Sequence, residues 1–287
     1  MLECVLNFSE GRDESIIDEI VSAVKTVKVL DVHSDSDHNR SVVTMVGEEQ
    51  PVRQAAFDLT EKATQLLDIS NHAGVHPFIG VVDVIPFIPL SGSTMLDAVN
   101  ASHLLGKELW SKLKLPVYYY GFAAMIAERK DLPYVRKGGY EALRREINDP
   151  HRKPDVGEGL NHKAGAVAVG ARNFLIAFNI NLNTNDLSLA RSIAKNIREK
   201  DGGLKGVRAL GLELQSRGIT QVSINLIDHK ETSLTQVYDQ VKVWAKEYQV
   251  DILESELVGM LPKDAYFPDM VKYLKMSQFN EDKILII

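Results

Sequence analysis

One order of predicted strands and helices occurs twice, once in each half of the chain, and it constrains the fold more than any other feature of the sequence. In the first half, short apolar runs predict strands, and apolar residues at helical spacing predict helices. Six elements result: strands at residues 2–8, 29–33, 41–47 and 81–85, and helices at residues 14–27 and 52–67. Their order, β-α-β-β-α-β, is typical of the ferredoxin-like fold. We expect Pro86 and Pro89 to end the last of these strands.

The second half of the chain predicts the same order. Its elements are strands at residues 173–181, 207–214, 220–226 and 252–260, and helices at residues 188–200 and 234–249. A helix at 94–113, a strand at 117–120 and a short helix at 140–147 extend the first copy, and residues 264–276 are expected to form a last helix. A chain of 287 residues is near the upper limit for a single hydrophobic core, so two subdomains are expected.

We therefore predict an α/β fold, an α+β sandwich of two ferredoxin-like subdomains, each a mixed or antiparallel β-sheet covered by helices. The predicted boundaries are 1–170 for the N-terminal subdomain and 171–287 for the C-terminal subdomain. Because ligand sites occur preferentially at domain interfaces, we expect a ligand cleft between the two.

Composition excludes several classes of function. A net charge of -6 argues against nucleic-acid binding, which needs a basic surface. No apolar run approaches the roughly 20 residues that cross a bilayer, and the first residues, MLECVLNFSEGRDE, lack the pattern of a signal peptide. The single cysteine, Cys4, allows no internal disulfide. We expect a cytoplasmic protein with small-molecule substrates and no membrane partner.

The segment from His72 to Pro77 is the densest candidate for chemistry. Its two histidines, His72 and His76, stand four residues apart, but Gly74 and Pro77 disfavour the helix that would align them for a metal, and no third ligand follows. We therefore predict no metal site. His76, on a loop just before a buried strand, suits a general base. The alternative is a histidine that satisfies backbone groups in a turn.

Further candidates lie in polar loops and near strand ends. Arg40, after the turn-forming run at 34–39, could clamp a carboxylate, although a plain hairpin explains the run equally well. The glycines of residues 155–165 would let the backbone approach a flat ligand, and His162 and Lys163 could meet its anionic tail, but a surface linker would look similar. The candidate substrate-binding residues, each of which could instead be a cap or turn residue, are Asn7, Arg40, Asp83, Asn179, Asn181 and Asn225.

Motifs that occur in order over residues 2–275 resemble the formiminotransferase domain family. They include NFSEG (7–11), HNRSV (38–42), H-x-G-x-HP-x-x-G-x-x-DV-x-PFIP (72–89), LP-x-x-R-x-G-x-YEAL (132–143) and G-x-x-x-x-GARNFLIAFNINL (165–182). The resemblance implies a glutamate formimidoyltransferase that moves a formimino group from N-formiminoglutamate to tetrahydrofolate in histidine degradation. It also implies two subdomains with a folate site between them, a homodimer, and tetrahydrofolate as co-substrate with no metal required. The cyclodeaminase domain of some members is not part of the match.

The resemblance also assigns residues. The family's catalytic histidine falls on His76. Its folate-binding stretch, here one residue shorter and without the usual aromatic residue, falls on Gly157, Glu158, Gly159, Leu160, Asn161, His162, Lys163, Ala164 and Gly165.

Three positions depart from the family pattern. Where the family has a glutamate, an arginine and a second glutamate, this chain has Val75, Phe78 and Phe122. The exchange predicts that apolar packing replaces a polar network beside the histidine. A second hypothesis therefore stands beside the enzyme: a folate-binding paralogue that acts on another one-carbon donor, such as a formyl donor, or is not catalytic.

Overall fold

The computed structural model describes residues 1–285, and its contacts divide the chain into two compact units. The first unit is Met1–Asn173, and the second begins at Phe174. The division predicted from sequence, after residue 170, lies beside this boundary. Each unit has its own main β-sheet and its own apolar core.

The first unit contains a six-stranded sheet in the order β2-β3-β1-β4-β6-β5. Its strands are β1 (Leu2–Phe8), β2 (Lys28–Asp35), β3 (Arg40–Gly47), β4 (Val82–Pro89), β5 (Val117–Gly121) and β6 (Val167–Ala171). Strands β2, β3, β1 and β4 pair antiparallel, as the ferredoxin-like prediction requires, and β6 pairs parallel with both β4 and β5. Strand β6 was not predicted: it is a five-residue run of small apolar residues, VAVGA, buried throughout.

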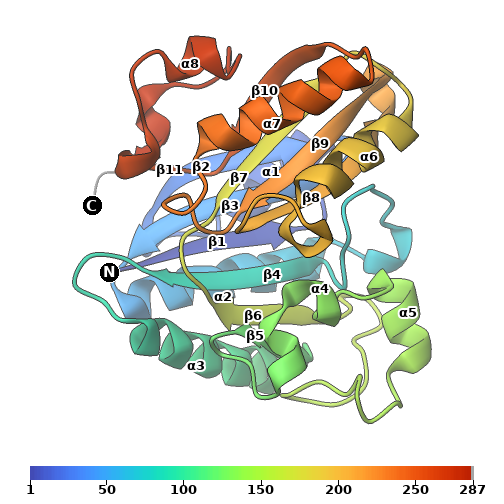
Figure 1. The fold of residues 1–287 in the computed structure, drawn as a ribbon. Coiled ribbons are helices and arrows are strands. Elements are labelled where there is room, and N and C mark those ends of the chain that lie inside the picture. The colour runs from blue at the N-terminus through green and yellow to red at the C-terminus, as the bar shows by residue number, and fades with distance from the viewer. Residues whose placement is uncertain (286–287) are drawn as a thin grey trace. The chain divides into compact units, whose positions relative to one another are not determined.

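Helices α2 and α3 pack on one face of this sheet (Figure 1). The helices of the unit are α1 (Glu14–Val21), α2 (Glu49–Leu66), α3 (Met95–Leu113), α4 (Leu132–Val135) and α5 (Gly139–Glu146). Helix α3 begins where the sequence places a capping box, in which the Thr94 hydroxyl and the Asp97 carboxylate each accept a backbone N–H. The side chains of α2 and α3 that face the sheet form the core with the inward residues of β1, β4 and β6.

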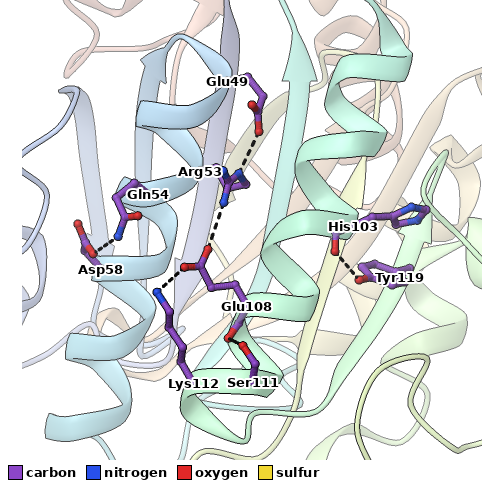
Figure 2. A network of polar contacts seen from close by, with 9 residues as sticks. All are labelled: Glu49, Arg53, Gln54, Asp58, His103, Glu108, Ser111, Lys112 and Tyr119. Carbon is purple, nitrogen blue, oxygen red and sulfur yellow. Dashed lines mark hydrogen bonds and ion pairs between the residues drawn. The ribbon is translucent and has the colours of Figure 1, made fainter.

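Ion pairs join α2 to α3 at the edge of this core (Figure 2). Arg53 lies between Glu49 of its own helix, at 3.0 Å, and Glu108 of α3, at 3.1 Å. Lys112 reaches the other oxygen of Glu108 at 2.6 Å. These contacts link the two helices that support the sheet.

The second unit contains a four-stranded antiparallel sheet in the order β10-β7-β9-β8. Its strands are β7 (Ile176–Leu182), β8 (Val207–Leu214), β9 (Ile219–Leu226) and β10 (Ile252–Val258), and its helices are α6 (Leu187–Ile197), α7 (Leu234–Glu247) and α8 (Met270–Tyr273). The short strands β11 (Leu261–Pro262) and β12 (Ile284–Leu285) pair parallel. Helices α6 and α7 cover one face of the sheet, and the order of the elements confirms the predicted repeat (Figure 1).

Several predicted ends are wrong, among them the end of the first helix, which is Val21 and not residue 27. Strand β4 continues through Pro86 to Pro89, and the pairs with β1 at Phe87 and Val84 flank Pro86, which has no N–H to donate. The predicted helix at 264–276 is reduced to α8, because Pro268 disfavours a helical residue before it and Asp269 takes a left-handed conformation with φ of 61°.

Among the described residues no helix is both long and apolar enough to cross a membrane.

Candidate active site around His76

The loop that carries His76 lies against the turn between β2 and β3. A Cβ atom on Gly74 would come within 2.3 Å of the carbonyl oxygen of His38, so only glycine allows the two segments to approach this closely. The Val75 amide donates a hydrogen bond to the Asp37 carbonyl at 3.3 Å. Two segments that sequence analysis treated as separate candidates therefore form one site.

Asn39 fixes this arrangement. Its side-chain nitrogen donates to the Ala73 carbonyl at 3.0 Å and lies 3.3 Å from Nδ1 of His72, while its side-chain oxygen accepts the Gly11 amide at 3.0 Å. Asn39 is buried and has a φ of 48°, a left-handed conformation that asparagine tolerates better than most residues. Sequence analysis placed Asn39 in a turn but gave it no role.

His76 is partly buried among positive charges. Burial is the largest cause that holds the pKa of His76 well below its usual range, and the charges of Arg40, Arg136 and His38 act in the same direction. The rings of His38 and His76 are stacked, with centroids 6.1 Å apart and planes at 23°. The imidazole of His76 is therefore neutral at physiological pH and can accept a proton.

Arg40 and Asn7, both predicted as substrate-binding, come together beside the His76 loop. Arg40 begins β3, and its Nη1 donates to Oδ1 of Asn7, on the adjacent strand β1, at 3.5 Å. Both side chains lie on the sheet face opposite α2 and α3, because Asn7 alternates with the inward-facing Leu6 and Phe8.

Asp83 is buried in β4, and its carboxylate accepts hydrogen bonds from the end of the His76 loop and from the residue that follows α4. One carboxylate oxygen accepts the Ile79 amide at 3.1 Å, and the other accepts the guanidinium of Arg136. Burial raises the pKa of Asp83, and the charges of Arg136 and Arg40 oppose that rise. Sequence analysis gave Asp83 as a candidate substrate-binding residue; its bond to the Ile79 amide holds the backbone where the loop returns to the sheet.

Arg136 is a site residue that sequence analysis missed. It lies inside the quoted motif LP-x-x-R, just after α4, where an arginine in a polar segment resembles many surface arginines. Its partner Asp83 is 53 residues away in sequence. Only the folded chain brings the two together.

Two glycines of the predicted folate-binding segment 157–165, Gly157 and Gly165, lie where a side chain would not fit. Gly157 has a φ of 88°, and a Cβ atom on it would lie 2.5 Å from the Trp110 ring. Gly165 forms a β-bridge with Gly80, the last residue of the loop motif that contains His76. The C-terminal end of the segment therefore lies beside the backbone that leads from His76 into β4.

The middle of the segment 157–165 is a loop, and hydrogen bonds of its own side chains hold it in place. The Asn161 side-chain oxygen accepts the amides of Lys163 and Ala164 at 3.0 and 2.9 Å, and Lys163 Nζ donates to the Gln65 carbonyl at 2.6 Å. Leu160 packs against the apolar core. Four residues of the segment remain exposed: Glu158, Gly159, His162 and Lys163. Their polar groups and backbone are open to a ligand.

Asn179, Asn181 and Asn225 belong to the second unit, on the face of its sheet opposite α6 and α7. The side-chain nitrogen of Asn179 donates to Glu256 at 3.0 Å, and that of Asn181 donates to Glu254 at 3.2 Å. Asn225, on the same face of β9, is exposed. The three asparagines thus lie on one polar face of a unit that does not contain His76.

The three apolar replacements do not form one packed group. Phe78 packs edge-on against the His72 ring at 4.5 Å between centroids. In contrast, the side chains of Val75 and Phe122 are 36% and 59% exposed. The expectation that apolar packing fills the place of a polar network is therefore wrong for Val75 and Phe122. Over residues 1–285, no three His, Cys, Asp or Glu side chains gather as metal ligands would.

Comparison with known proteins covers nearly the whole chain. The N-terminal subdomain of the formiminotransferase domain matches residues 1–172, and a second formiminotransferase domain model matches residues 177–284. A glutamate formimidoyltransferase from Thermoplasma acidophilum is 41% identical, over 99% of this chain and 96% of that protein. One from Streptococcus pyogenes is 37% identical, over 100% of this chain and 97% of its own length. A formimidoyltransferase-cyclodeaminase from Gallus gallus is 38% identical over 56% of its length.

Proposed function

The chain belongs to the formiminotransferase family, and from this membership we propose that it is a glutamate formimidoyltransferase in which His76 moves the proton. It transfers the formimino group from N-formiminoglutamate to tetrahydrofolate, giving 5-formiminotetrahydrofolate and glutamate in histidine degradation. The relatives from Thermoplasma and Streptococcus, similar over nearly their full lengths, support the reaction. The observation that carries the role of His76 is its place on a partly buried loop against the His38 ring, where burial and the charges of Arg40 and Arg136 lower the pKa of the imidazole.

The proton balance of the reaction explains why a neutral imidazole is needed. As N5 of tetrahydrofolate bonds to the formimino carbon, N5 must lose a proton, and the glutamate nitrogen must gain one before its bond to that carbon breaks. His76 accepts the first proton and returns it to the leaving nitrogen, so the imidazole ends the cycle unchanged. A low pKa keeps the ring ready to accept the proton and makes the imidazolium a strong acid for its return. Binding both substrates in one place supplies much of the remaining rate.

Other residues are proposed to bind the substrates. Residues 157–165 bind the folate, because their exposed glycine backbone can approach a flat ring and the segment ends beside the His76 loop. Arg40 binds a carboxylate of the formimino donor, and Asn7 orients Arg40. The proposed substrate-binding residues further from His76 in sequence are Asn179, Asn181 and Asn225. No step in this proposal uses a metal.

A second function is favoured by a specific observation. Val75 and Phe122 expose apolar surface where the family pattern has glutamates, and this change alters how a charged donor is recognised. The chain could on that account bind folate and use a different one-carbon donor, such as a formyl donor, or not be catalytic. Turnover measurements with both donors separate the two functions.

The proposed function is tested by the variant His76→Ala. We expect turnover of formiminoglutamate and tetrahydrofolate to fall by about 100- to 10,000-fold, because a positioned proton-transfer group contributes that much. The dissociation constant for tetrahydrofolate, measured by isothermal titration, should change by less than about threefold. Such a small change would show that the variant lacks the imidazole but keeps the folate site intact. The exposed His151 of the same unit provides the matched control His151→Ala.

Two results would contradict the proposal. Folate binding by the wild-type protein without turnover of either donor would favour the non-catalytic paralogue. Full turnover by His76→Ala would assign the proton transfer to another group. A homodimer and a cytoplasmic location complete the proposal, and light scattering and cell fractionation measure them.

A further inference from the structure

Arg136 is held in one orientation beside the His76 loop by a buried carboxylate. Asp83 accepts one guanidinium N–H of Arg136 with one oxygen and the Ile79 amide with the other. The Asp83 side chain is 3% exposed, and that of Arg136 is 17% exposed. A charge-assisted bond to a buried partner removes most of the freedom of a long side chain, so the guanidinium is preorganised.

Packing places this guanidinium next to the loop. Val135, which precedes Arg136, shares one apolar cluster with Leu143 of α5 and with Ile79. A Cβ atom on Gly139 would lie 3.5 Å from the Phe78 carbonyl oxygen, so the start of α5 touches the same loop. The charge of Arg136, like that of Arg40, acts on both His76 and Asp83. The two guanidiniums are therefore close to the group that moves the proton.

Arg136 has donors left for a ligand. A guanidinium carries five N–H donors, and Asp83 takes one. The Nε atom of Arg136 is buried and has no hydrogen-bond partner among residues 1–285, which is costly for a charged group. The Arg136 side chain as a whole is not fully buried, with 17% of it exposed. A carboxylate, which accepts two parallel N–H bonds, fits such a fork.

We propose that Arg136, held by Asp83, determines donor specificity by binding the α-carboxylate of the amino acid that leaves. This inference rests on the proposed function of the same site. The leaving nitrogen is bonded to the Cα atom that carries this carboxylate, so the carboxylate lies a few bonds from the carbon that reacts beside His76. The carboxylates of folate are at the far end of its tail, away from N5. An anion-binding group next to His76 therefore meets the donor rather than the folate tail.

The test compares Arg136→Met and Arg136→Lys with wild type. We expect the KM for formiminoglutamate to rise about 10- to 100-fold in Arg136→Met with a smaller change in kcat, as loss of a hydrogen bond to a charged group predicts. The affinity for glutamate, measured by titration, should fall equally. Arg136→Lys should restore only part of the affinity, because an ammonium lacks the fork. The affinity for tetrahydrofolate should not change.

Two further variants separate binding from folding. Arg136→Met leaves Asp83 buried without its partner, so the double variant Asp83→Asn/Arg136→Met removes the uncompensated charge and should show the same loss of glutamate affinity. Arg53→Met also breaks an ion pair of the first unit, between α2 and α3, and is the matched control for loss of an arginine (Figure 2). It should keep wild-type KM values.

Each outcome decides the inference. Wild-type glutamate affinity in the folded double variant, or no detectable glutamate binding by the wild-type protein, would overturn it. A loss of tetrahydrofolate affinity in place of glutamate affinity would overturn it as well, because the carboxylate would then belong to folate. Glutamate binding that depends on Arg136 in a protein without turnover would support the carboxylate site and would contradict only the proposed function.

Discussion

At the scale of single residues, the environment of each ionisable group decides what it can do. His76 and Asp83 lie within reach of the same two arginines, Arg40 and Arg136, yet burial shifts their pKa values in opposite directions. Burial disfavours charge on both, so it lowers the pKa of the imidazole and raises that of the carboxyl group. The nearby positive charges then lower both values. The imidazole of His76 therefore favours its neutral form, and the carboxyl group of Asp83 is engaged by Arg136.

Glu3 shows the cost of a buried carboxyl group and gives a testable pH dependence. Burial is the main cause that raises the pKa of Glu3 to about 7, and the charge of Arg172 only partly opposes it. The folded protein therefore holds a proton that the unfolded chain releases near pH 4.5. Its contribution to stability is complete below that pH and is lost as the pH rises to about 7.

We expect the variant Glu3→Gln to remove this pH dependence. The free energy of unfolding of wild type, minus that of the variant, should fall by about 3 kcal/mol between pH 4 and pH 8, because the folded protein binds the Glu3 proton more tightly than the unfolded chain does. Urea unfolding at several pH values measures the difference. A difference that stays constant with pH would show that Glu3 is ionised in the folded protein.

At the scale of elements, a buried ion pair holds the start of the proposed folate-binding segment, residues 157–165. Arg129, in the 3-10 turn Ala127–Lys130, contacts Asp155 at 2.5 Å, and both side chains are less than 8% exposed. Asp155 also accepts the Tyr119 amide of β5 at 2.7 Å. These bonds hold the chain just before residue 157 against β5, the edge strand of the six-stranded sheet.

Breaking this pair should destabilise the first unit. We expect Arg129→Met to lower the free energy of unfolding by about 3–5 kcal/mol, because it leaves a buried carboxylate without its partner. The double variant Arg129→Met/Asp155→Asn should recover part of the loss. Urea unfolding followed by circular dichroism measures both. Equal stability of the single and double variants would mean that solvent reaches Asp155.

At the scale of the whole molecule, the two units have cores that share no residue over the described part of the chain. Phe178 is a fully buried side chain of the second core. We expect Phe178→Ala to cost about 3–5 kcal/mol, as is usual for a buried phenylalanine. Hydrogen exchange should locate the lost protection in β7, β9 and β10. Equal loss of protection in β1 and β4 would show instead that the units unfold together.

The sequence by itself determined the repeated β-α-β-β-α-β order, because strand and helix periodicity depends on residues a few positions apart. It also predicted the family, and it identified as candidates the loops that carry His76 and Arg40. Local signals were weaker where the chain departs from simple rules, as in β4, which passes through Pro86, and in α8, which Pro268 shortens.

Only the tertiary structure decided which distant groups meet. Strand β6 enters the sheet between β4 and β5, Asn39 joins the His76 loop to the turn before β3, and Arg136 bonds to Asp83 across 53 residues of sequence. No local pattern encodes such contacts, since they depend on how sheet pairing and core packing bring separate segments together. His76 and Arg40 could therefore be identified as candidates from the sequence, while Asn39, Arg136 and the partners of all four residues followed only from the fold.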